Sequence, residues 1–434
     1  MTPSRQQAAV CTACGCVCDD IVLHVEAEQI IQAEHACDRG SAWFAGPHRS
    51  QGPAAFLHGA PIDLESAVDQ AVTWLRAARY PLICGLGDTT CEAQRLAVAL
   101  ADRLGALLDT TTSDSHGPAG LAFQGVGEVT CTLGEVKNRA DLVVFWGCDP
   151  VRNLPRHAER YSVTARGLFT PHGRASRTIL AVDIVPTETT ALADETVLLR
   201  PGSDFEALWT LRCLVKGVPP SSEVEAQTGV ALERWRELAQ RLRACRFGVM
   251  FFGKGLSQTP GRHHNVEALY SLVVDLNAHT RFYAKPMGAP GNVSGADNVV
   301  TWSTGYPFAV NLARGYPRFG PGEFTAQEVL ARGEADLALI VARDPLGLFP
   351  SAEAREQLAR IPYISIGPVP TAAPLCFVTA TPGIHAGGTV YRMDDVALPL
   401  RAVLPCQLPS EEELLGRLLE RLTSAAPSEV SARG

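Results

Sequence analysis

The chain has 434 residues, a formal net charge of −8 and 46% hydrophobic residues. This length is too great for one simple core and predicts two or three domains. The balance of apolar and charged residues excludes long disorder, and the lack of a Lys/Arg block argues against a non-specific nucleic-acid or membrane surface.

No apolar run approaches the roughly 20 residues that a membrane-spanning helix needs. The first residues also lack an apolar core of signal-peptide length, so we expect a cytoplasmic location and mostly reduced thiols. The 13 cysteines are distributed unevenly, and five of them lie in the first 37 residues. Scattered cysteines usually behave as small buried hydrophobes, but a cluster requires another explanation.

In chain order, we expect a small Cys-rich domain at 1–55 and two α/β domains at 56–215 and 216–434. The first domain contains a strand-like run at 21–25. In the remainder, short apolar runs alternate with Ala/Leu/Arg-rich stretches of helical periodicity. This alternation predicts an α/β fold with mostly parallel sheets.

Several elements occur twice. A buried strand at 81–84 precedes Gly85-Leu86-Gly87 and a helix at 91–108, while a strand at 247–252 precedes Gly253-Lys254-Gly255 and a helix near residue 265. Segments 140–150 and 335–345 each combine an Ala-Asp-Leu lead, a buried strand and an Asp-Pro turn. Segments 184–187 and 368–371 form a third pair. These ordered matches predict two related α/β halves.

Ligands bind beyond the carboxyl ends of parallel strands, where these Gly-x-Gly and Asp-Pro turns fall. The candidate cofactor-binding residues are therefore Gly85, Gly87, Gly147, Cys148, Asp149, Asp183, Gly253, Lys254, Arg262 and Asp344. Arg262 could meet a phosphate or carboxylate through charge-assisted hydrogen bonds. The alternative is that these are only tight turns, since both Gly-x-Gly segments lack the third glycine of a dinucleotide fingerprint.

The cysteine cluster is the strongest local signal. Cys11, Cys14, Cys18 and Cys37 follow the spacing C-x2-C-x3-C-x18-C. Three close thiolates and one from a later loop can enclose a [4Fe–4S] cluster, and the same ligands could hold zinc tetrahedrally. A cluster is the favoured interpretation, with zinc or no metal as alternatives. Cys16 does not fit the spacing and is interpreted as a bystander.

The sequence resembles the B subunits of formylmethanofuran dehydrogenases, including their bacterial formyltransferase/hydrolase variant. The resemblance rests on CTACGCVCDDI and HACDRG in the N-terminal part, SHGPAG at 115–120 and CTLGEVKNRADLVVFWGCDP at 131–150. It continues through LADETVLLRPGSD at 192–204, the long segment at 291–324 and GGTVYRMDDV at 387–396. It therefore covers nearly the whole chain.

This resemblance implies a fold of the molybdopterin oxidoreductase superfamily, with a small Cys-rich domain and two related parallel-sheet domains. Active members of the family carry one [4Fe–4S] cluster and a tungsten or molybdenum ion held by two pyranopterin guanine dinucleotides, and they interconvert carbon dioxide and formate. The resemblance also implies partner subunits A, C and D, and the first of these handles the formyl amide of methanofuran. No nucleic-acid or membrane partner is expected.

One departure from the family concerns the catalytic position. Active members have Cys or selenocysteine before His-Gly-Pro, and here that residue is Ser115, followed by His116 as the expected proton donor or acceptor. A serine oxygen is a harder ligand than a thiolate. Either Ser115 still binds the metal, or the redox site has been lost, as in the bacterial complex that releases formate from formyl-methanofuran. We favour the loss of redox chemistry, although the complete four-cysteine set favours activity.

Overall fold

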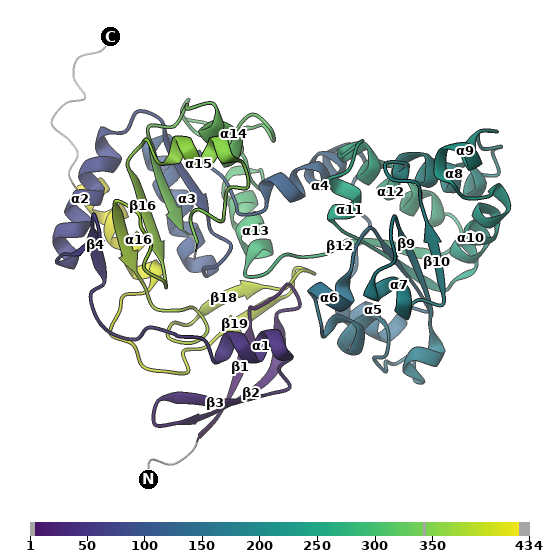
Figure 1. The fold of residues 1–434 in the computed structure, drawn as a ribbon, viewed down its shortest axis with the longest axis horizontal. Helices are drawn as coiled ribbons and strands as arrows, with labels where there is room; N and C mark the ends of the chain where they lie inside the picture. The colour runs from purple at the N-terminus through teal and green to yellow at the C-terminus, as the bar shows by residue number, and fades with distance from the viewer. Residues whose placement is uncertain (1–4, 342–343, 425–434) are drawn as a thin grey trace. The chain divides into compact units, whose positions relative to one another are not determined.

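The computed structural model describes residues 5–341 and 344–424, which separate into two compact units (Figure 1). Unit 1 comprises the segment up to Asp114, Ala289–Arg392 and the segment from Ala397 onward; unit 2 comprises Ser115–Gly288 and Met393–Val396. Among the described residues, no helix has the length and apolar character needed to cross a lipid bilayer.

Unit 1 begins with a three-stranded antiparallel sheet and a short helix, in the order β1 (Arg5–Cys11), β2 (Cys18–Glu26), β3 (Gln29–Glu34) and α1 (Asp38–Phe44). The strand predicted at 21–25 is the alternately buried centre of β2. Val10 and Val17 at the end of this sheet pack with Val390 and Leu400 of the hairpin β18 (Gly388–Tyr391) and β19 (Ala397–Leu400).

The main sheet of unit 1 has nine strands among the described residues. Its order is β14 (Arg318–Phe319), β13 (Val310–Asn311), β7 (Leu107–Leu108), β6 (Pro81–Gly85), β15 (Leu337–Val341), β16 (Tyr363–Gly367), β17 (Leu375–Val378), β4 (Ala55–Leu57) and β5 (Ala60–Pro61). The five strands from β7 to β17 are parallel, and the flanking strands pair antiparallel.

Helices cover both faces of this sheet. Alternate strand residues such as Ile83 and Leu82 enter different cores, because successive side chains point to opposite faces. One face packs against α2 (Leu64–Ala77), α3 (Cys91–Leu104), α13 (Val293–Thr304) and α16 (Glu411–Ser424). The other packs against α14 (Ala326–Ala331) and α15 (Ala352–Leu358). Burial on both faces explains why the central strands are continuously apolar.

The helix predicted at 91–108 is shorter than expected. Helix α3 ends at Leu104, because Gly105 adopts a left-handed conformation (φ 61°) and caps it. Residues Leu107–Leu108 then form β7. The apolar run Ala106-Leu107-Leu108 is compatible with either a helix or a strand, so Gly105 was the decisive signal.

Unit 2 contains a five-stranded, fully parallel sheet in the order β10 (Glu195–Leu198), β9 (Thr178–Asp183), β8 (Leu142–Trp146), β11 (Phe247–Phe252) and β12 (Arg281–Pro286). The chain enters unit 2 within α4 (Ser113–Val126). The other helices are α5 (Leu133–Arg139), α6 (Pro150–Asn153), α7 (Glu188–Leu192), α8 (Asp204–Lys216), α9 (Val224–Thr228), α10 (Leu232–Ala244), α11 (Lys254–Ser257) and α12 (His263–Leu276).

The two units contain the same five-strand arrangement. The order β7-β6-β15-β16-β17 in unit 1 matches β12-β11-β8-β9-β10 in unit 2. The two predicted Gly-x-Gly turns follow the matching strands β6 and β11, and the Ala-Asp-Leu strands are the matching β15 and β8. Ala342 and Arg343, which belong to the second repeat segment, lie outside the described residues.

The compact units differ from the predicted domains 56–215 and 216–434. The boundary at 215/216 falls near the end of α8, inside unit 2. Within the shared five-strand arrangement, each predicted half supplies two strands to one unit and three to the other. For the first half, β6 and β7 lie in unit 1, whereas β8, β9 and β10 lie in unit 2. The local pattern predicts the strands but not this exchange, because strand pairing joins residues that are distant in sequence.

Candidate functional site

The four predicted cysteine ligands lie in three neighbouring elements of unit 1. Cys11 ends β1, Cys18 begins β2 opposite it, and Cys14 lies in the connecting turn. Cys37 caps the start of α1. The turn requires a left-handed residue at Val17 (φ 37°), whose N–H donates to the Cys14 carbonyl oxygen at 3.1 Å. A β-branched residue in this conformation is strained, which is typical of a functional turn.

The thiols of these four cysteines are close enough to interact electrostatically. The pKa of Cys11 is raised to about 12, chiefly by burial and also by the neighbouring Cys18, Cys14 and Cys37. Gly40 leaves room for two of the sulfurs, because a Cβ there would lie 3.2 Å from Cys11 Sγ and 3.9 Å from Cys37 Sγ. An all-thiol set of this kind suits iron–sulfur or zinc chemistry.

Two further observations concern whether these cysteines form a metal site. Cys16 is completely buried in the turn between β1 and β2. Within the described part of the chain, no group of three or more His, Cys, Asp or Glu side chains is placed so that it could hold a metal ion. The other three thiols lie within electrostatic range of Cys11, but the described residues are not arranged as a metal site, so the site and any bound group stay a prediction.

Ser115 and His116 lie in the first turn of α4, in unit 2. Ser115 is 9% exposed, and its carbonyl oxygen accepts a hydrogen bond from Ser257 Oγ at 3.4 Å. Ser257 ends the short helix α11, which starts at the predicted site residue Lys254. The first turn of α4 is thereby fixed beside the segment that follows β11.

The carboxyl ends of β8 and β11 meet at backbone distance in unit 2. Gly255 N–H donates to the Gly147 carbonyl oxygen at 3.0 Å, and a Cβ on Gly147 would lie 2.8 Å from the Gly255 carbonyl carbon. A Cβ on Gly253 would lie 2.7 Å from Cys148 Cβ. Because the strand order reverses direction between β8 and β11, this is the switch point at which open α/β sheets bind ligands. The prediction named Gly147 and Gly253 but omitted Gly255.

Three polar residues follow β8 and β9 at the same edge. Asp149 Oδ1 accepts hydrogen bonds from Thr189 N–H at 3.1 Å and Thr189 Oγ1 at 2.5 Å, so this predicted ligand already ties the turn to α7. Burial and the charges of Asp183 and Asp149 raise the pKa of Cys148. Burial also raises the pKa of half-buried Asp183. Asp183 Oδ1 accepts a hydrogen bond from Ile184 N–H at 2.8 Å, so this carboxylate also fixes its own turn.

The predicted cation Arg262 lies at the start of α12 and is exposed, with a left-handed φ of 40°. Its neighbours His263 and His264 stack on each other, and His264 Nδ1 lies 3.4 Å from Glu267 Oε2. Lys254 begins α11 on the preceding segment. Both cations belong to unit 2 and lie between β11 and α12.

The predicted residues of unit 1 lie at the equivalent switch point, between β6 and β15. Gly85 and Leu86 both have left-handed φ values (97° and 72°). Thr111 Oγ1 donates to the Gly85 carbonyl oxygen at 2.8 Å and accepts from Gly87 N–H at 3.0 Å. Asp344 follows β15 and lines a recess of about 290 Å³ with Leu346 and other residues.

Asn292 also fixes this turn, and sequence reasoning missed it. Its N–H donates to the Gly87 carbonyl oxygen at 2.5 Å, and its buried side chain bridges to Thr89 O (2.9 Å) and Tyr391 N–H (2.7 Å). The available signal was its position in the segment 291–324, on which the family resemblance partly rests.

No family model matches the chain. The chain is 40% identical over 426 residues to the B subunit of the tungsten-containing formylmethanofuran dehydrogenase 2 of Methanocaldococcus jannaschii, covering 95% of this chain and 97% of the relative. It is 37% identical to the corresponding Methanococcus maripaludis protein, covering 95% and 98%. The B subunit of the formyltransferase/hydrolase complex Fhc of Methylorubrum extorquens is 28% identical, covering 85% of this chain and 97% of that protein.

Solved structures agree with these relatives. The Methylorubrum extorquens formyltransferase/hydrolase complex with methylofuran contains a chain that matches with a TM-score of 0.70 and 26% identity, covering 86% of this chain and 99% of that one. Acetylene hydratase from Pelobacter acetylenicus matches with a TM-score of 0.68 and 11% identity, covering 96% and 70%. This second likeness concerns the fold alone. The fold is the α/β architecture of molybdopterin-type oxidoreductases, as the sequence predicted.

Within that class, the relative that is 40% identical across almost the full chain defines the family. The chain belongs to the family of formylmethanofuran dehydrogenase B subunits, as the resemblance in its motifs indicated.

Proposed function

We propose that this B subunit supports formate release from formyl-methanofuran in a formyltransferase/hydrolase-type complex and itself carries no redox step. The observation that carries this proposal is Ser115 at the position where active members have a Cys or selenocysteine ligand. A neutral hydroxyl is a poor replacement for a soft thiolate on tungsten or molybdenum. Amide hydrolysis instead requires a metal-activated water, which the family places in its amidohydrolase-like A subunit.

The partners in this proposal are subunits A, C and D of the same complex, working in the cytoplasm. Support comes from the names of the relatives, which are B subunits of multi-subunit enzymes, and from the Fhc complex among the structural matches. In this arrangement, His116 has no proton to transfer, and the fold of the B subunit serves the assembly.

A second candidate function is the redox one, in which this chain interconverts carbon dioxide and formate. The proximity of Cys14, Cys18 and Cys37 to Cys11 favours it, as does the 40% identity to a tungsten-containing relative. When bound, a tungsten or molybdenum pterin would supply the two-electron chemistry. The close glycines Gly147 and Gly253 would admit its nucleotide part, and Asp183 would accept hydrogen bonds from it.

Ser115→Ala in the purified complex separates the two candidates. We expect formate release from formyl-methanofuran to stay unchanged, and wild-type complex to show no dye-linked formate oxidation. Wild-type complex that contains tungsten or molybdenum with extractable pterin, and that loses formate oxidation in the alanine variant, would overturn the non-redox proposal. Ser115→Cys is the matched variant, because it restores the soft ligand.

The iron–sulfur proposal for the cysteine site has its own test. We propose that Cys11, Cys14, Cys18 and Cys37 hold a [4Fe–4S] cluster, which in a non-redox protein would stabilise the N-terminal sheet. Cys18→Ser should abolish the visible iron–sulfur absorption and the bound iron of anaerobically purified complex. Cys16→Ser, at an equally buried neighbour, should retain both. Stoichiometric zinc without iron in the wild-type protein would replace the cluster with a zinc site.

A further inference from the structure

A loop in unit 2 presents two large apolar side chains to solvent. The loop spans 164–176, between the helical turn Ala158–Ser162 and β9. At its tip, Leu168 is 74% exposed and Phe169 is 51% exposed. Single exposed apolar residues are common, but two adjacent ones at a loop tip are a candidate contact point.

The buried side chain of Arg177 binds the backbone of the loop. Arg177 is 5% exposed, and its Nη1 donates to the carbonyl oxygens of Val163 (3.4 Å) and Ala165. Its Nη2 donates to Lys137 O at 2.6 Å and Thr170 Oγ1 at 3.0 Å. A buried guanidinium is expensive unless its donors are satisfied, and here the loop and α5 accept hydrogen bonds from Nη1 and Nη2, while Nε has no partner among the described residues.

The tip itself is fastened to the end of α5. Leu168 N–H donates to Asn138 Oδ1 at 3.0 Å, and Phe169 N–H donates to Asn138 O at 2.8 Å. Gly167 packs so closely that a Cβ there would lie 2.1 Å from Lys137 O. The exposed apolar pair is therefore fixed in position before any partner binds, which lowers the entropic cost of docking.

Cations surround this apolar pair. The Arg139 guanidinium lies over the Phe169 ring at 4.9 Å from its centroid, and Lys137 and Arg166 are exposed beside the tip. Among the described residues, none of these three cations forms an ion pair with a carboxylate. Because the whole chain carries a net charge of −8, this local positive rim requires a specific explanation.

We propose that Leu168 and Phe169 dock into an apolar recess edged by Asp or Glu side chains on another protein of the complex. This inference rests on the proposed function, which supplies the multi-subunit assembly. The rim cations would orient the partner, and the rigid pair would provide the desolvated centre of the contact. A membrane surface is a poorer match, since recognition of anionic lipid usually uses about 4–8 clustered cations.

The test uses the intact complex, with the chain co-expressed with subunits A, C and D of its own organism. We expect the double variant Leu168→Glu/Phe169→Glu to lose one particular partner in native mass spectrometry, with binding weakened roughly tenfold or more. Arg139→Glu/Arg166→Glu should weaken binding of the same partner, and the effect should shrink as salt rises. Val218→Glu is a matched control at an exposed site elsewhere, and it should leave the complex intact.

Thermal melting of the isolated variants checks that they fold. We expect them to fold, because the substituted side chains are exposed. A wild-type complex that both double variants leave intact would overturn the docking proposal alone. A wild-type chain that retains none of the three partners would overturn the proposed function as well. Co-sedimentation with phosphatidylserine/phosphatidylcholine vesicles that depends on Leu168 and Phe169, with the complex unaffected, would assign the loop to a membrane instead.

Discussion

Unit 1 and unit 2 place a glycine-containing turn at the same point of the same five-strand arrangement but fix it by different means. In unit 2, backbone packs directly against backbone where Gly147 meets Gly255. In unit 1, the side chains of Thr111 and Gln94 bind the turn, and Gln94 Nε2 donates to Leu86 O at 2.8 Å. Asn292 binds it through its backbone N–H to Gly87 O, and its side chain donates to Thr89 O just after the turn. The edge of unit 2 therefore depends on the absence of side chains. The edge of unit 1 depends on specific polar side chains as well as on a close glycine, since a Cβ on Gly291 would lie 2.3 Å from Gly87 O.

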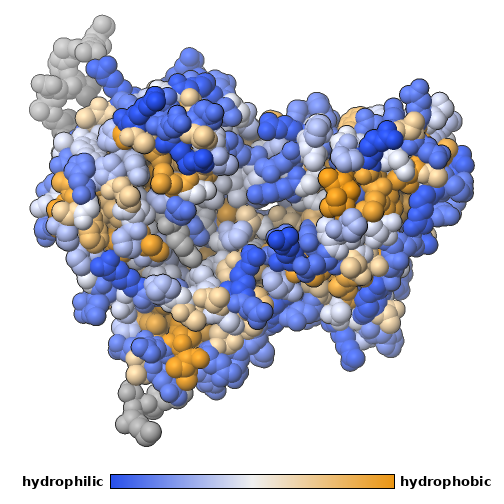
Figure 2. All heavy atoms as spheres, viewed as in Figure 1, coloured by the Kyte–Doolittle hydropathy of each residue, from blue (hydrophilic) through white to orange (hydrophobic). Residues whose placement is uncertain are grey.

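Outside the strands, the two units also differ in how they present apolar surface. Figure 2 shows apolar side chains gathered in the area of α12 on unit 2, where α12 packs against α8. Phe205 and Trp209 of α8 stack on each other and are partly exposed. Unit 2 thus offers apolar surface at positions other than the docking loop, and controls on that loop need exposed sites of similar character.

The largest effect is expected for a side chain placed between the two loops of unit 2. In Gly255→Val, the new Cβ would lie 2.6 Å from Gly147 O, so the loops must separate. We expect a loss of about 3 kcal/mol or more in the free energy of unfolding, measured by urea denaturation. The matched control Gly125→Ala, on the exposed part of α4 with nothing within 4 Å, should be neutral or slightly stabilising. Equal midpoints for the two variants would contradict the backbone-contact account.

The corresponding test in unit 1 removes a side chain. Asn292→Ala deletes the acceptor for Tyr391 N–H and the donor to Thr89 O, and both groups are left inside the protein. We expect a loss of about 2–3 kcal/mol from these buried unsatisfied groups. Asn153→Ala, at an exposed asparagine with one hydrogen bond to Asp149 O, should lose about 0.5 kcal/mol. Similar losses in the two variants would remove the distinction between the units.

A pH effect should arise in unit 1, at the residue that follows β7. Asp109 is fully buried and accepts hydrogen bonds from Ala309 N–H, Ala326 N–H and Ser113 Oγ. Burial nevertheless raises its pKa from 3.8 to about 7. The folded state therefore holds a proton that the unfolded state has released, and stability falls as pH rises from about 4 to 7, by at most about 1.4 kcal/mol per pH unit.

The measurement for Asp109 is urea denaturation of wild type and Asp109→Asn across that pH window. The asparagine variant cannot titrate, so its stability should change less between the two ends of the window. The fixed offset from its altered hydrogen bonds does not affect this comparison. A variant with the same pH slope as the wild type would show that other groups, such as buried His385, control the pH dependence.

Much of this architecture was predictable from local patterns, and the exceptions have physical reasons. The strands at 81–84 and 247–252, the parallel sheets and the turns after them follow from apolar runs with glycine punctuation. The exchange of strands between the predicted halves was not predictable, since no local pattern encodes which distant strand becomes a neighbour. The four-cysteine pattern could be recognised from the sequence because all four residues lie within 27 positions. The role of Asn292 could not, because it contacts a turn that is 205 residues away in sequence.

The same difference between local patterns and contacts with distant residues applies to the individual site residues. Turn glycines such as Gly147 were recognisable, because only glycine tolerates such close backbone approach. Asp149 also has a structural contact, since its Oδ1 accepts two hydrogen bonds from Thr189 of α7. Sequence spacing places a carboxylate at a strand end but does not reveal which nearby hydroxyl it will bind.

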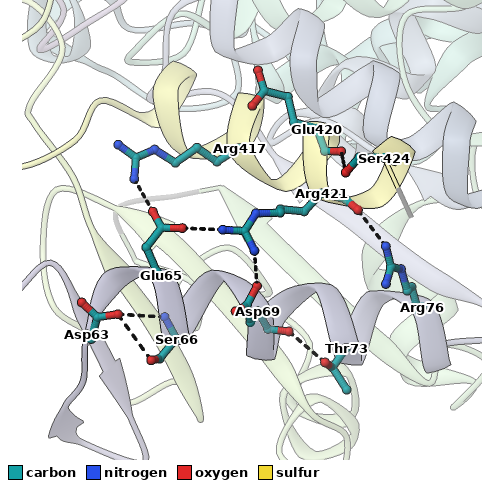
Figure 3. Close-up of polar contacts among 10 residues, drawn as sticks. All are labelled: Asp63, Glu65, Ser66, Asp69, Thr73, Arg76, Arg417, Glu420, Arg421 and Ser424. Atoms are coloured by element: carbon teal, nitrogen blue, oxygen red, sulfur yellow. Dashed lines mark hydrogen bonds and ion pairs between the residues drawn. The ribbon is translucent and has the colours of Figure 1, made fainter. Parts of the chain in front are cut away.

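The smallest effect concerns ion pairs on the two surfaces. In unit 1, Arg421 of α16 contacts Glu65 and Asp69 of α2, each at 2.6 Å, and Arg417 also reaches Glu65 (Figure 3). These side chains are about half exposed, so solvent and salt screen them. In unit 2, Arg212 contacts Asp275 at 2.9 Å with both side chains largely buried, and it also stacks on Trp209.

We therefore expect Arg421→Ala to lower the free energy of unfolding by only about 0.5–1 kcal/mol, because solvent already screens these ion pairs. In about 1 M salt the loss should be smaller still. Arg212→Ala should cost more and respond less to salt. Among the described residues, it leaves the poorly solvated Asp275 with only Lys216 as an ion-pair partner, at 3.4 Å, and it uncovers Trp209. Urea denaturation of both variants at low and high salt measures this difference. An Arg421 variant with the larger, salt-independent loss would mean that the α2–α16 contact acts through packing of the arginine stem rather than through charge.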